Sequence, residues 1–479
     1  MVSFLQPKSY KKIFLLLLIV SISPLLFSKI NLIGNHEIPN YLTNFFNFKD
    51  FLINHEEINF MISSENQRYR PTFYTIKGLE YFLLKDNHFF YFALKFLLII
   101  FSAYFIYEVN KIIFKKEDLI FFSTSAIFFF PTNYDIFARL DVQEFYFLIF
   151  FSIFTFLIIK KNFFENLKYK LNDFFVFILL ILISGVKEIF VLHICLFIIV
   201  NYLFNLKIII FKNKFYYFFL IFIQLLFLTK FLSIFANVGS GAYDLEHNFN
   251  KLFFLIKIFP FQNPINFALI FGWIVCIFLN YQIRISLYDF KLLLLLSSHI
   301  ILDYFFYQGL GSYRHYLIGL ICLVYFFSII YKKYFFEISL FKKKAYMIKN
   351  FSFFIVLIFF IMLFSLNLKM TFQNIKEHKI LSRIYNSDQD LIIKSQIPHE
   401  RFISLAYFSN FYKPQKQIIY SDGKKSFLIS PENLTFRFSM PKNHYIISNN
   451  EFDCLIFDKG LDLEECKILY FFPKEINLF

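Results

Sequence analysis

Long apolar segments alternate with short polar ones along almost the whole chain. A helix needs about 20 apolar residues to cross the hydrocarbon core of a bilayer, and a shorter helix can cross where neighbouring helices shield it. The pattern therefore predicts an all-α polytopic membrane protein with about eleven transmembrane helices. The predicted spans are 13–28, 88–107, 119–131, 144–159, two within 174–204, 215–235, 264–281, 288–306, 313–331 and 351–368.

Segment 174–204 is interrupted near Gly185, so it can form one bent helix or two short ones. A single crossing would place the lysines of 207–214 outside and would invert every later span. Two crossings keep these lysines on the cytoplasmic side, as the positive-inside rule expects. We therefore predict two spans in this segment.

Lysine-rich segments set the predicted orientation. Lys8, Lys11 and Lys12 precede the first span, and six lysines lie within 332–349. Both groups belong on the cytoplasmic side. The first apolar segment lacks a small-residue cleavage site, which favours an uncleaved span over a signal peptide. The pattern thus predicts a multi-pass protein of the inner (plasma) membrane, with a cytoplasmic N-terminus and an extracytoplasmic C-terminus.

Two long polar regions fall on the predicted outer side. Residues 29–87 form the first outer loop, in which the short apolar segment 72–84 predicts an interfacial or re-entrant helix. Residues 372–479 alternate β-like runs with turn residues, which predicts a small extracytoplasmic α/β domain after a transmembrane domain of residues 1–371. The β-like runs are 417–420, 426–429, 444–447, 454–457 and 468–472.

Composition narrows the class of protein. Apolar residues make up 58% of the chain and Phe alone accounts for 79 of 479 residues, which excludes a soluble globule. The net charge of +15 reflects the lysines beside the spans and a composition rich in Phe, Ile, Lys, Asn and Tyr. No basic stripe with interleaved aromatics stands apart from the spans, so no nucleic-acid partner is expected. No cysteine or histidine spacing predicts a metal site, although Cys454 and Cys466 are suited to a disulfide if they lie outside.

Charged residues gather at the predicted outer ends of the spans. A charge beside hydrocarbon is costly, so the position of each of these residues needs a structural or functional explanation. Lys187-Glu188 is either a mutually neutralising pair at a helix break or a cation aimed at an anionic substrate and oriented by its neighbour. Arg68 and Arg70 precede Pro71, which suits either headgroup anchoring or a lipid-linked phosphate. The spacing within 244–247 is loose for a metal site.

Arg139 and Arg314 both stand near a predicted helix start, where a cation is disfavoured. Asp141 and Glu144 can cap the helix that follows them, but capping leaves Arg139 unexplained. An anion close to both arginines would resolve the oddity. In the first loop, Glu37 and Asp50 are either solvated acids or bases that accept a proton from an acceptor hydroxyl.

The order of these charged segments resembles the GT-C superfamily of integral-membrane glycosyltransferases, which includes protein mannosyltransferase-like and aminoarabinose transferase-like enzymes. The resemblance covers roughly residues 10–370. The matching features are Glu37 after the first span, Tyr69-Arg70-Pro71 at the close of the first outer loop, Arg139 to Glu144 before a span, Lys187-Glu188 at a helix break, and Arg314-His315 at the start of a late span. The chain departs from the family at the first acid, where many relatives carry two acidic residues and this chain has Asn35-His36-Glu37.

The resemblance implies an inverting hexosyl or pentosyl transfer from a polyprenyl-phosphate-sugar to a glycan or lipid acceptor in the cell envelope. It implies Glu37 as the catalytic base, with Asp50 as the alternative. It also implies a substrate-binding set of His36, Arg68, Tyr69, Arg70, Arg139, Glu144, Lys187, Glu188, Arg314 and His315. No cofactor is implied, and branches of the family differ in their use of a divalent metal.

Two other functions stay open. An O-antigen-type polymerase or ligase would use the same carrier as a diphosphate, usually with an arginine-rich late outer loop, whereas the large loop here is the first. A lipid or polyol transporter would show paired halves and Gly- or Pro-broken spans, of which a chain with 11 Gly and 12 Pro gives little sign. Charges deep within the spans would favour the transporter.

Overall fold

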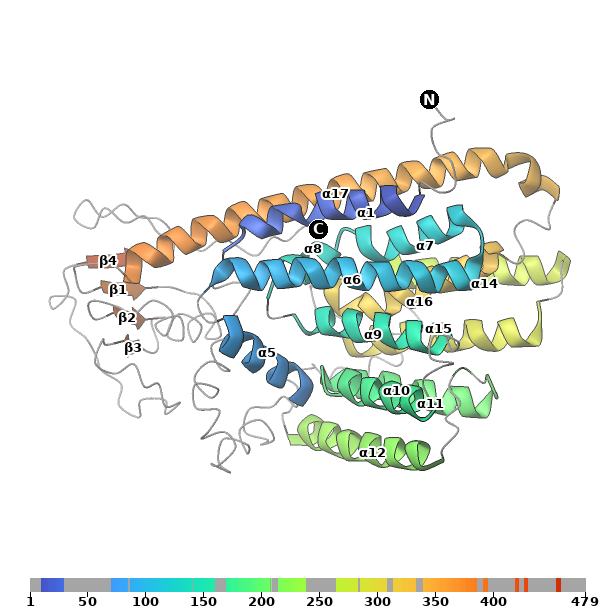
Figure 1. The fold of residues 1–479 in the computed structure, drawn as a ribbon, viewed down its shortest axis with the longest axis horizontal. Helices are drawn as coiled ribbons and strands as arrows, with labels where there is room; N and C mark the ends of the chain where they lie inside the picture. The colour runs from blue at the N-terminus through green and yellow to red at the C-terminus, as the bar shows by residue number, and fades with distance from the viewer. Residues whose placement is uncertain are drawn as a thin grey trace.

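The computed structural model of the chain describes residues 10–29, 70–84, 87–140, 142–159, 169–206, 208, 214–237, 264–282, 285–307, 313–332, 339–385, 391–394, 418–421, 426–429 and 454–457. These residues form a bundle of helices and one small sheet (Figure 1). The helices are α1 (Tyr10–Ile22), the 3-10 helix η3 (Ser23–Phe27), α5 (Pro71–Leu84), α6 (His88–Phe114), α7 (Glu117–Phe129), α8 (Asn133–Ala138), α9 (Gln143–Ile159), α10 (Tyr169–Ser184), α11 (Glu188–Leu203), α12 (Lys214–Asn237), α14 (Pro264–Gln282), α15 (Leu287–Tyr307), the 3-10 helix η7 (Tyr313–Tyr316), α16 (Leu317–Ile330) and α17 (Ser339–Tyr385).

Every predicted span coincides with a helix, and segment 174–204 forms two helices, α10 and α11, as predicted. Among the described residues, three helices are long and apolar enough to cross a membrane, namely Tyr10–Phe27, His88–Phe114 and Asn350–Ile375. Six shorter apolar helices accompany them in the same described set. The structure is therefore consistent with a membrane protein, while the number of crossings stays a prediction.

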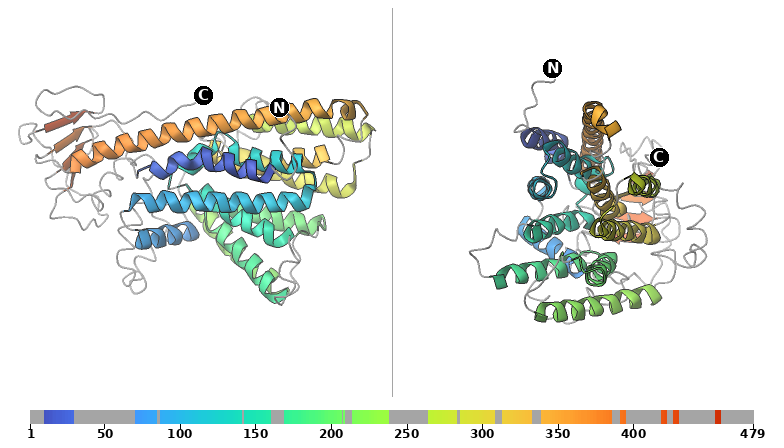
Figure 2. Two further views of the ribbon diagram at one scale, coloured as in Figure 1. Left: turned by 45° about the horizontal axis from the view of Figure 1, so that its top comes forward. Right: turned by 90° about the vertical axis from the view of Figure 1, so that its right-hand side faces the viewer.

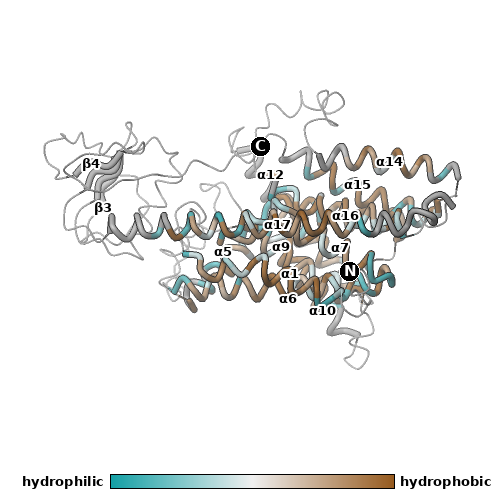
Figure 3. Tube along the Cα trace, turned by 90° about the horizontal axis from the view of Figure 1, so that it is seen from above, coloured by the Kyte–Doolittle hydropathy of each residue, from teal (hydrophilic) through white to brown (hydrophobic). Residues whose placement is uncertain are grey.

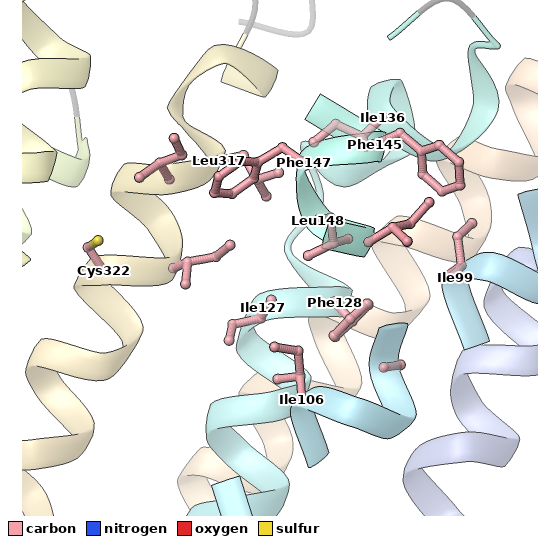
Figure 4. Close-up of a cluster of buried hydrophobic side chains, with 14 of the residues drawn as sticks. Ile99, Ile106, Ile127, Phe128, Ile136, Phe145, Phe147, Leu148, Leu317 and Cys322 are labelled. Atoms are coloured by element: carbon pink, nitrogen blue, oxygen red, sulfur yellow. The ribbon is translucent and has the colours of Figure 1, made fainter. Parts of the chain in front are cut away.

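Large aromatic and aliphatic side chains fill the bundle and also cover its outside. Figure 4 shows part of the interior, where Ile106 of α6, Phe128 of α7 and Leu148 of α9 gather with Leu317 of α16. Apolar residues predominate along most of the coloured helices (Figure 3), and some of their side chains, such as Phe218, are largely exposed. A surface this apolar suits lipid rather than water.

The bundle has two distinct ends. At one, Asn374 Nδ2 donates to Ser28 Oγ at 2.7 Å and the His378 ring lies against His88. At the other, Lys11 pairs with Glu108 at 2.5 Å and Lys332 donates to the carbonyl of Ile113. We call these the Ser28 end and the Lys11 end. Lys11, before the first span, and Lys332, after α16, are both predicted to be cytoplasmic and share this end.

Helix α17 is longer than the predicted span 351–368. It covers 47 residues, or about 70 Å at 1.5 Å per residue, and runs along the whole bundle (Figures 1 and 2). The predicted domain boundary between residues 371 and 372 lies inside this continuous helix. The change from apolar to polar composition marks where hydrophobic surface ends, not where the helix ends.

The four strands after α17 form one mixed sheet. They are β1 (Leu391–Lys394), β2 (Ile418–Ser421), β3 (Ser426–Ile429) and β4 (Cys454–Phe457), in the order β3-β2-β1-β4. β1 is parallel to β2 and β4, whereas β2 and β3 are antiparallel. Three of the predicted β-like runs coincide with β2, β3 and β4, and the runs at 444–447 and 468–472 lie outside the described residues. The α/β domain as a unit stays a prediction.

Candidate functional site

Helix α5 docks its first turn on the break between α10 and α11. The amide of Thr72 donates to the carbonyl of Gly185 at 3.0 Å. A Cβ on Gly185 would lie 2.3 Å from Thr72 Oγ1 and 3.3 Å from Pro71 Cγ, so only glycine allows this approach. Pro71 opens the helix, where its missing N–H costs nothing. This contact brings Arg70 to the start of α11.

Arg70 and Glu188 form a buried ion pair. Arg70 Nε donates to both carboxylate oxygens of Glu188, at 3.0 and 3.1 Å, and the two side chains are 2% and 1% exposed. Glu188 is the first residue of α11, where the helix dipole also favours a negative charge. Arg70 therefore holds the end of the first loop against α11 through its Nε, and its part in binding the substrate phosphate stays a prediction.

Lys187, Glu144 and His315 form a second cluster beside this pair. Lys187 Nζ lies 2.5 Å from Glu144 Oε1, and His315 Nδ1 lies 2.9 Å from both of these atoms. The other carboxylate oxygen, Glu144 Oε2, is buried and has no hydrogen-bond partner among the described residues. Lys187 thus contacts α9, whereas its neighbour Glu188 contacts Arg70. Because each has its own partner, the interpretation of Lys187-Glu188 as a self-neutralising pair is wrong.

Asp135 is the anion that the two unexplained arginines required. Arg314 Nη1 lies 3.4 Å from Asp135 Oδ2, and Arg139 Nη1 lies 3.5 Å from Asp135 Oδ1. Asp135 belongs to α8, a short helix that the sequence pattern did not predict. The residue stands four positions before Arg139, a helical spacing that could have found it. Arg314 Nε is buried, and no residue in the described ranges forms a hydrogen bond with it.

Tyr134 borders this part of the cluster. Burial, helped by the charge of Asp135, raises the pKa of Tyr134 to about 12 against the opposing effect of Arg139 and Arg314. Its phenol therefore stays neutral at physiological pH and keeps a proton to donate. Lys95 of α6 holds the backbone of Arg139 in place, since its ammonium group donates to the carbonyl of Arg139.

The cluster has a buried floor and a partly exposed rim. Glu144, Lys187, Arg70 and Glu188 form the floor, while the side chains of Asp135, Arg139, Arg314 and His315 are 14–16% exposed. Four cations (Arg70, Arg139, Lys187, Arg314) face three carboxylates (Asp135, Glu144, Glu188), which leaves one net positive charge with His315 neutral. With a hydrogen-bond donor and an acceptor left over, this arrangement suits an anionic ligand that also carries hydroxyl groups.

Seven of the predicted site residues are brought together here: Arg70, Arg139, Glu144, Lys187, Glu188, Arg314 and His315. The other five, His36, Glu37, Asp50, Arg68 and Tyr69, lie outside the described residues. Sequence reasoning missed Asp135, and it also missed a buried trio of His193, His299 and Asp303. In the described part of the chain, no three His, Cys, Asp or Glu side chains are arranged to hold a metal ion.

No protein-family model and no curated protein sequence matches the chain.

Proposed function

We propose that the protein is a membrane glycosyltransferase that moves a sugar from a polyprenyl-phosphate donor to an acceptor hydroxyl at the outer membrane surface. The observation that carries the proposal is the convergence of Arg139, Lys187 and Arg314 at the Ser28 end, around a net positive charge. By the positive-inside rule, the lysine-rich Lys11 end faces the cytoplasm, so the site faces outward.

The proposed roles of the site residues follow from where negative charge develops during sugar transfer. As the glycosidic bond breaks, negative charge grows on the carrier phosphate, and Arg314 and Arg139 on the rim are placed to stabilise it. Lys187 and Glu144 lie below these arginines and contribute to the electrostatic field at the phosphate position. Glu37, or else Asp50, is the proposed base for the acceptor hydroxyl. The exposed Leu79 and Leu83 of α5 offer an apolar path for the lipid tail.

The full chain reconstituted in lipid nanodiscs tests this proposal. A panel of polyprenyl-phosphate-linked sugars is added with detergent-solubilised envelope glycolipids as acceptors, and release of polyprenyl phosphate is measured. We expect release with at least one sugar, and Arg314→Gln to slow it by about 100-fold, as loss of a transition-state donor does. Lys11→Gln is the matched control, because Lys11 forms an ion pair at the opposite end. Release that is unchanged in Arg314→Gln would contradict the proposal.

A transporter is the second candidate, because His193, His299 and Asp303 form a buried polar group within the helices. A transporter moves its lipid intact, whereas a glycosyltransferase cleaves it. The same nanodisc assay therefore separates them, since intact lipid-linked sugar at all times would favour transport. A polymerase or ligase would instead release polyprenyl diphosphate.

A further inference from the structure

His193, His299 and Asp303 form a hydrogen-bonded chain inside the bundle, apart from the charged cluster described above. His193 Nε2 lies 2.8 Å from Asp303 Oδ1, and His193 Nδ1 lies 2.9 Å from His299 Nδ1. The amide of Gly319 donates to Asp303 Oδ2 at 2.6 Å. All three side chains are buried, at 8% exposure or less. The chain joins three helices, α11, α15 and α16.

The carboxylate of Asp303 is held at the start of α16. Gly319 lies in the first turn of that helix, whose amides have no partner within the helix. Asp303 therefore supplies a hydrogen-bond acceptor from a neighbouring helix and also sits at the positive end of the helix dipole. A Cβ on Gly319 would lie only 3.1 Å from Asp303 Oδ2, so glycine keeps this approach open.

The hydrogen-bond partners fix where the protons lie. An ionised Asp303 can only accept, so His193 carries its proton on Nε2 and its Nδ1 is an acceptor. His299 must then donate from Nδ1, which makes His299 Nε2 the acceptor at the far end, where no hydrogen bond joins it to the described residues. The chain is thus directional: His299 donates to His193, and His193 donates to Asp303.

We propose that His299, His193 and Asp303 form a proton-binding relay. A proton binds His299 Nε2, the Nδ1 proton of His299 passes to His193 Nδ1, and the Nε2 proton of His193 passes to Asp303. One proton enters, both imidazoles exchange tautomers and remain neutral, and the carboxylate becomes a carboxylic acid. Both hydrogen bonds within the trio are kept with their directions reversed, and Asp303 Oδ2 still accepts from the Gly319 amide. The charge of the trio changes from −1 to zero.

The surroundings act on the Asp303 carboxylate in opposite directions. Within the described residues, the partners of Asp303 are His193, the Gly319 amide and the nearby thiol of Cys322. In that described part, the one contact at ion-pair distance that the trio makes lies within it, between His193 and Asp303. A buried carboxylate without a cationic partner is costly, whereas two donated hydrogen bonds and a helix dipole favour it. These opposing effects make a protonation site in a membrane protein.

The relay lies directly beneath the charged cluster. His193 follows Glu188 by five residues on α11, and Gly319 follows His315 by four, which corresponds to about 6–8 Å of helix. The charged groups above it are Lys187, Glu188, Arg314 and His315, with Glu144 from α9. Uptake of a proton removes a negative charge below these residues and so strengthens the positive potential at the rim.

Infrared pH-difference spectroscopy of the full chain in nanodiscs tests the relay without any glycosyl transfer. We expect a protonated-carboxyl band on acidification that is lost in Asp303→Asn, a change that keeps the shape and the acceptor for Gly319. Asp289→Asn is the matched control, because Asp289 is a buried aspartate of the same helix. His299→Phe removes the entry atom, so the band should shift its pH midpoint or form more slowly.

A second measurement needs no substitution. Nitrogen-15 NMR of histidine-labelled wild-type protein should show two neutral imidazoles that exchange tautomers together as the pH falls. A carboxyl band that survives in Asp303→Asn would overturn the relay. An unchanged pH midpoint and an unchanged rate of band formation in His299→Phe would also overturn it. The same holds if the imidazoles of His193 and His299 become doubly protonated instead of exchanging tautomers. Loss of sugar transfer with an intact carboxyl band in Arg314→Gln would concern the proposed function alone.

Discussion

Lys187 and Glu188 are adjacent and carry opposite charges, but they form ion pairs with different residues at the floor of the site. Lys187 is held by Glu144 of α9, and Glu188 by Arg70 at the start of α5. The sharp change of direction at the break between α10 and α11 makes this possible, because two neighbouring side chains there leave the backbone towards different helices. Each pair is almost fully buried, so each carboxylate depends on its own cation.

Removal of Arg70 should therefore destabilise the fold strongly. Arg70→Leu leaves Glu188 as an uncompensated buried charge, at a cost of about 3–5 kcal/mol in the free energy of unfolding. Arg70→Leu/Glu188→Leu should recover most of this loss, since no charge is then left unpaired. Thermal unfolding in detergent measures both variants. Lys11→Leu, in a more exposed pair, should cost about 1 kcal/mol or less. A double variant no more stable than Arg70→Leu would show that the pair acts in another way.

Lys187 gives a prediction about activity. Lys187→Met should slow the proposed transfer by about 100-fold, because it removes a preorganised cation below the phosphate position. Lys187→Arg should not restore the rate, since a planar guanidinium cannot occupy the point at which Glu144 and His315 meet the ammonium. Initial rates from single-turnover assays decide between these outcomes. Full activity in Lys187→Met would place the chemistry elsewhere.

The sequence predicted which charged residues matter at the site but not how they pair. Arg139, Lys187 and Arg314 stand out because a charge beside an apolar segment is unusual. Their partners depend on contacts between residues far apart in the chain, such as Arg314 with Asp135, which no local pattern contains. Asp135 lies in a six-residue helix that is too short to leave a periodic signal, so only its four-residue spacing from Arg139 could have pointed to it.

At the level of elements, the docking of α5 depends on Gly185. Gly185→Ala would push a methyl group into Thr72 Oγ1, so the first turn of α5 must move away from the α10–α11 break. We expect a loss of about 1–3 kcal/mol in stability, typical of overpacking, and weaker binding of polyprenyl phosphate. Gly185→Ala/Thr72→Ala should restore part of both, because the closest atom is removed. Thermal unfolding and nanodisc binding measure the two effects. An unchanged Gly185→Ala protein would mean that α5 is not held at this point.

The apolar segments predicted which parts of the chain form helices better than they predicted where those helices begin and end. Span 88–107 became α6, His88–Phe114, because Glu108 and Lys111 continue the helix after the apolar surface stops. The same reason extends α17 beyond span 351–368 at both ends. Hydrophobic length reports the part of a helix that meets lipid, whereas helix ends are set by backbone hydrogen bonding and caps.

At the scale of the whole molecule, the two ends of the bundle differ in chemistry. The Lys11 end carries ion pairs and lysines close to the surface, and the Ser28 end carries the buried charged floor and its rim. The contacts of α16 fit this division, since its Gly319 meets Asp303 near the end of α15, and Lys332 after α16 meets the end of α6. The sequence could predict this two-sidedness because the positive-inside pattern is summed over many residues.

The orientation of the two ends can be measured directly on α6. Asn87 and Lys115 flank this helix, are both exposed, and lie about 40 Å apart along it. In a background with Cys454 and Cys466 changed to Ser, we expect Asn87→Cys to react with a membrane-impermeant maleimide in intact cells. Lys115→Cys should react only in inverted vesicles. The three cysteines within the helices are sheltered by their own spans, and the parent without either new cysteine measures their background. Labelling of Lys115→Cys from outside would turn the charged site towards the cytoplasm, where a nucleotide-sugar donor would be the simpler expectation than a lipid-linked one.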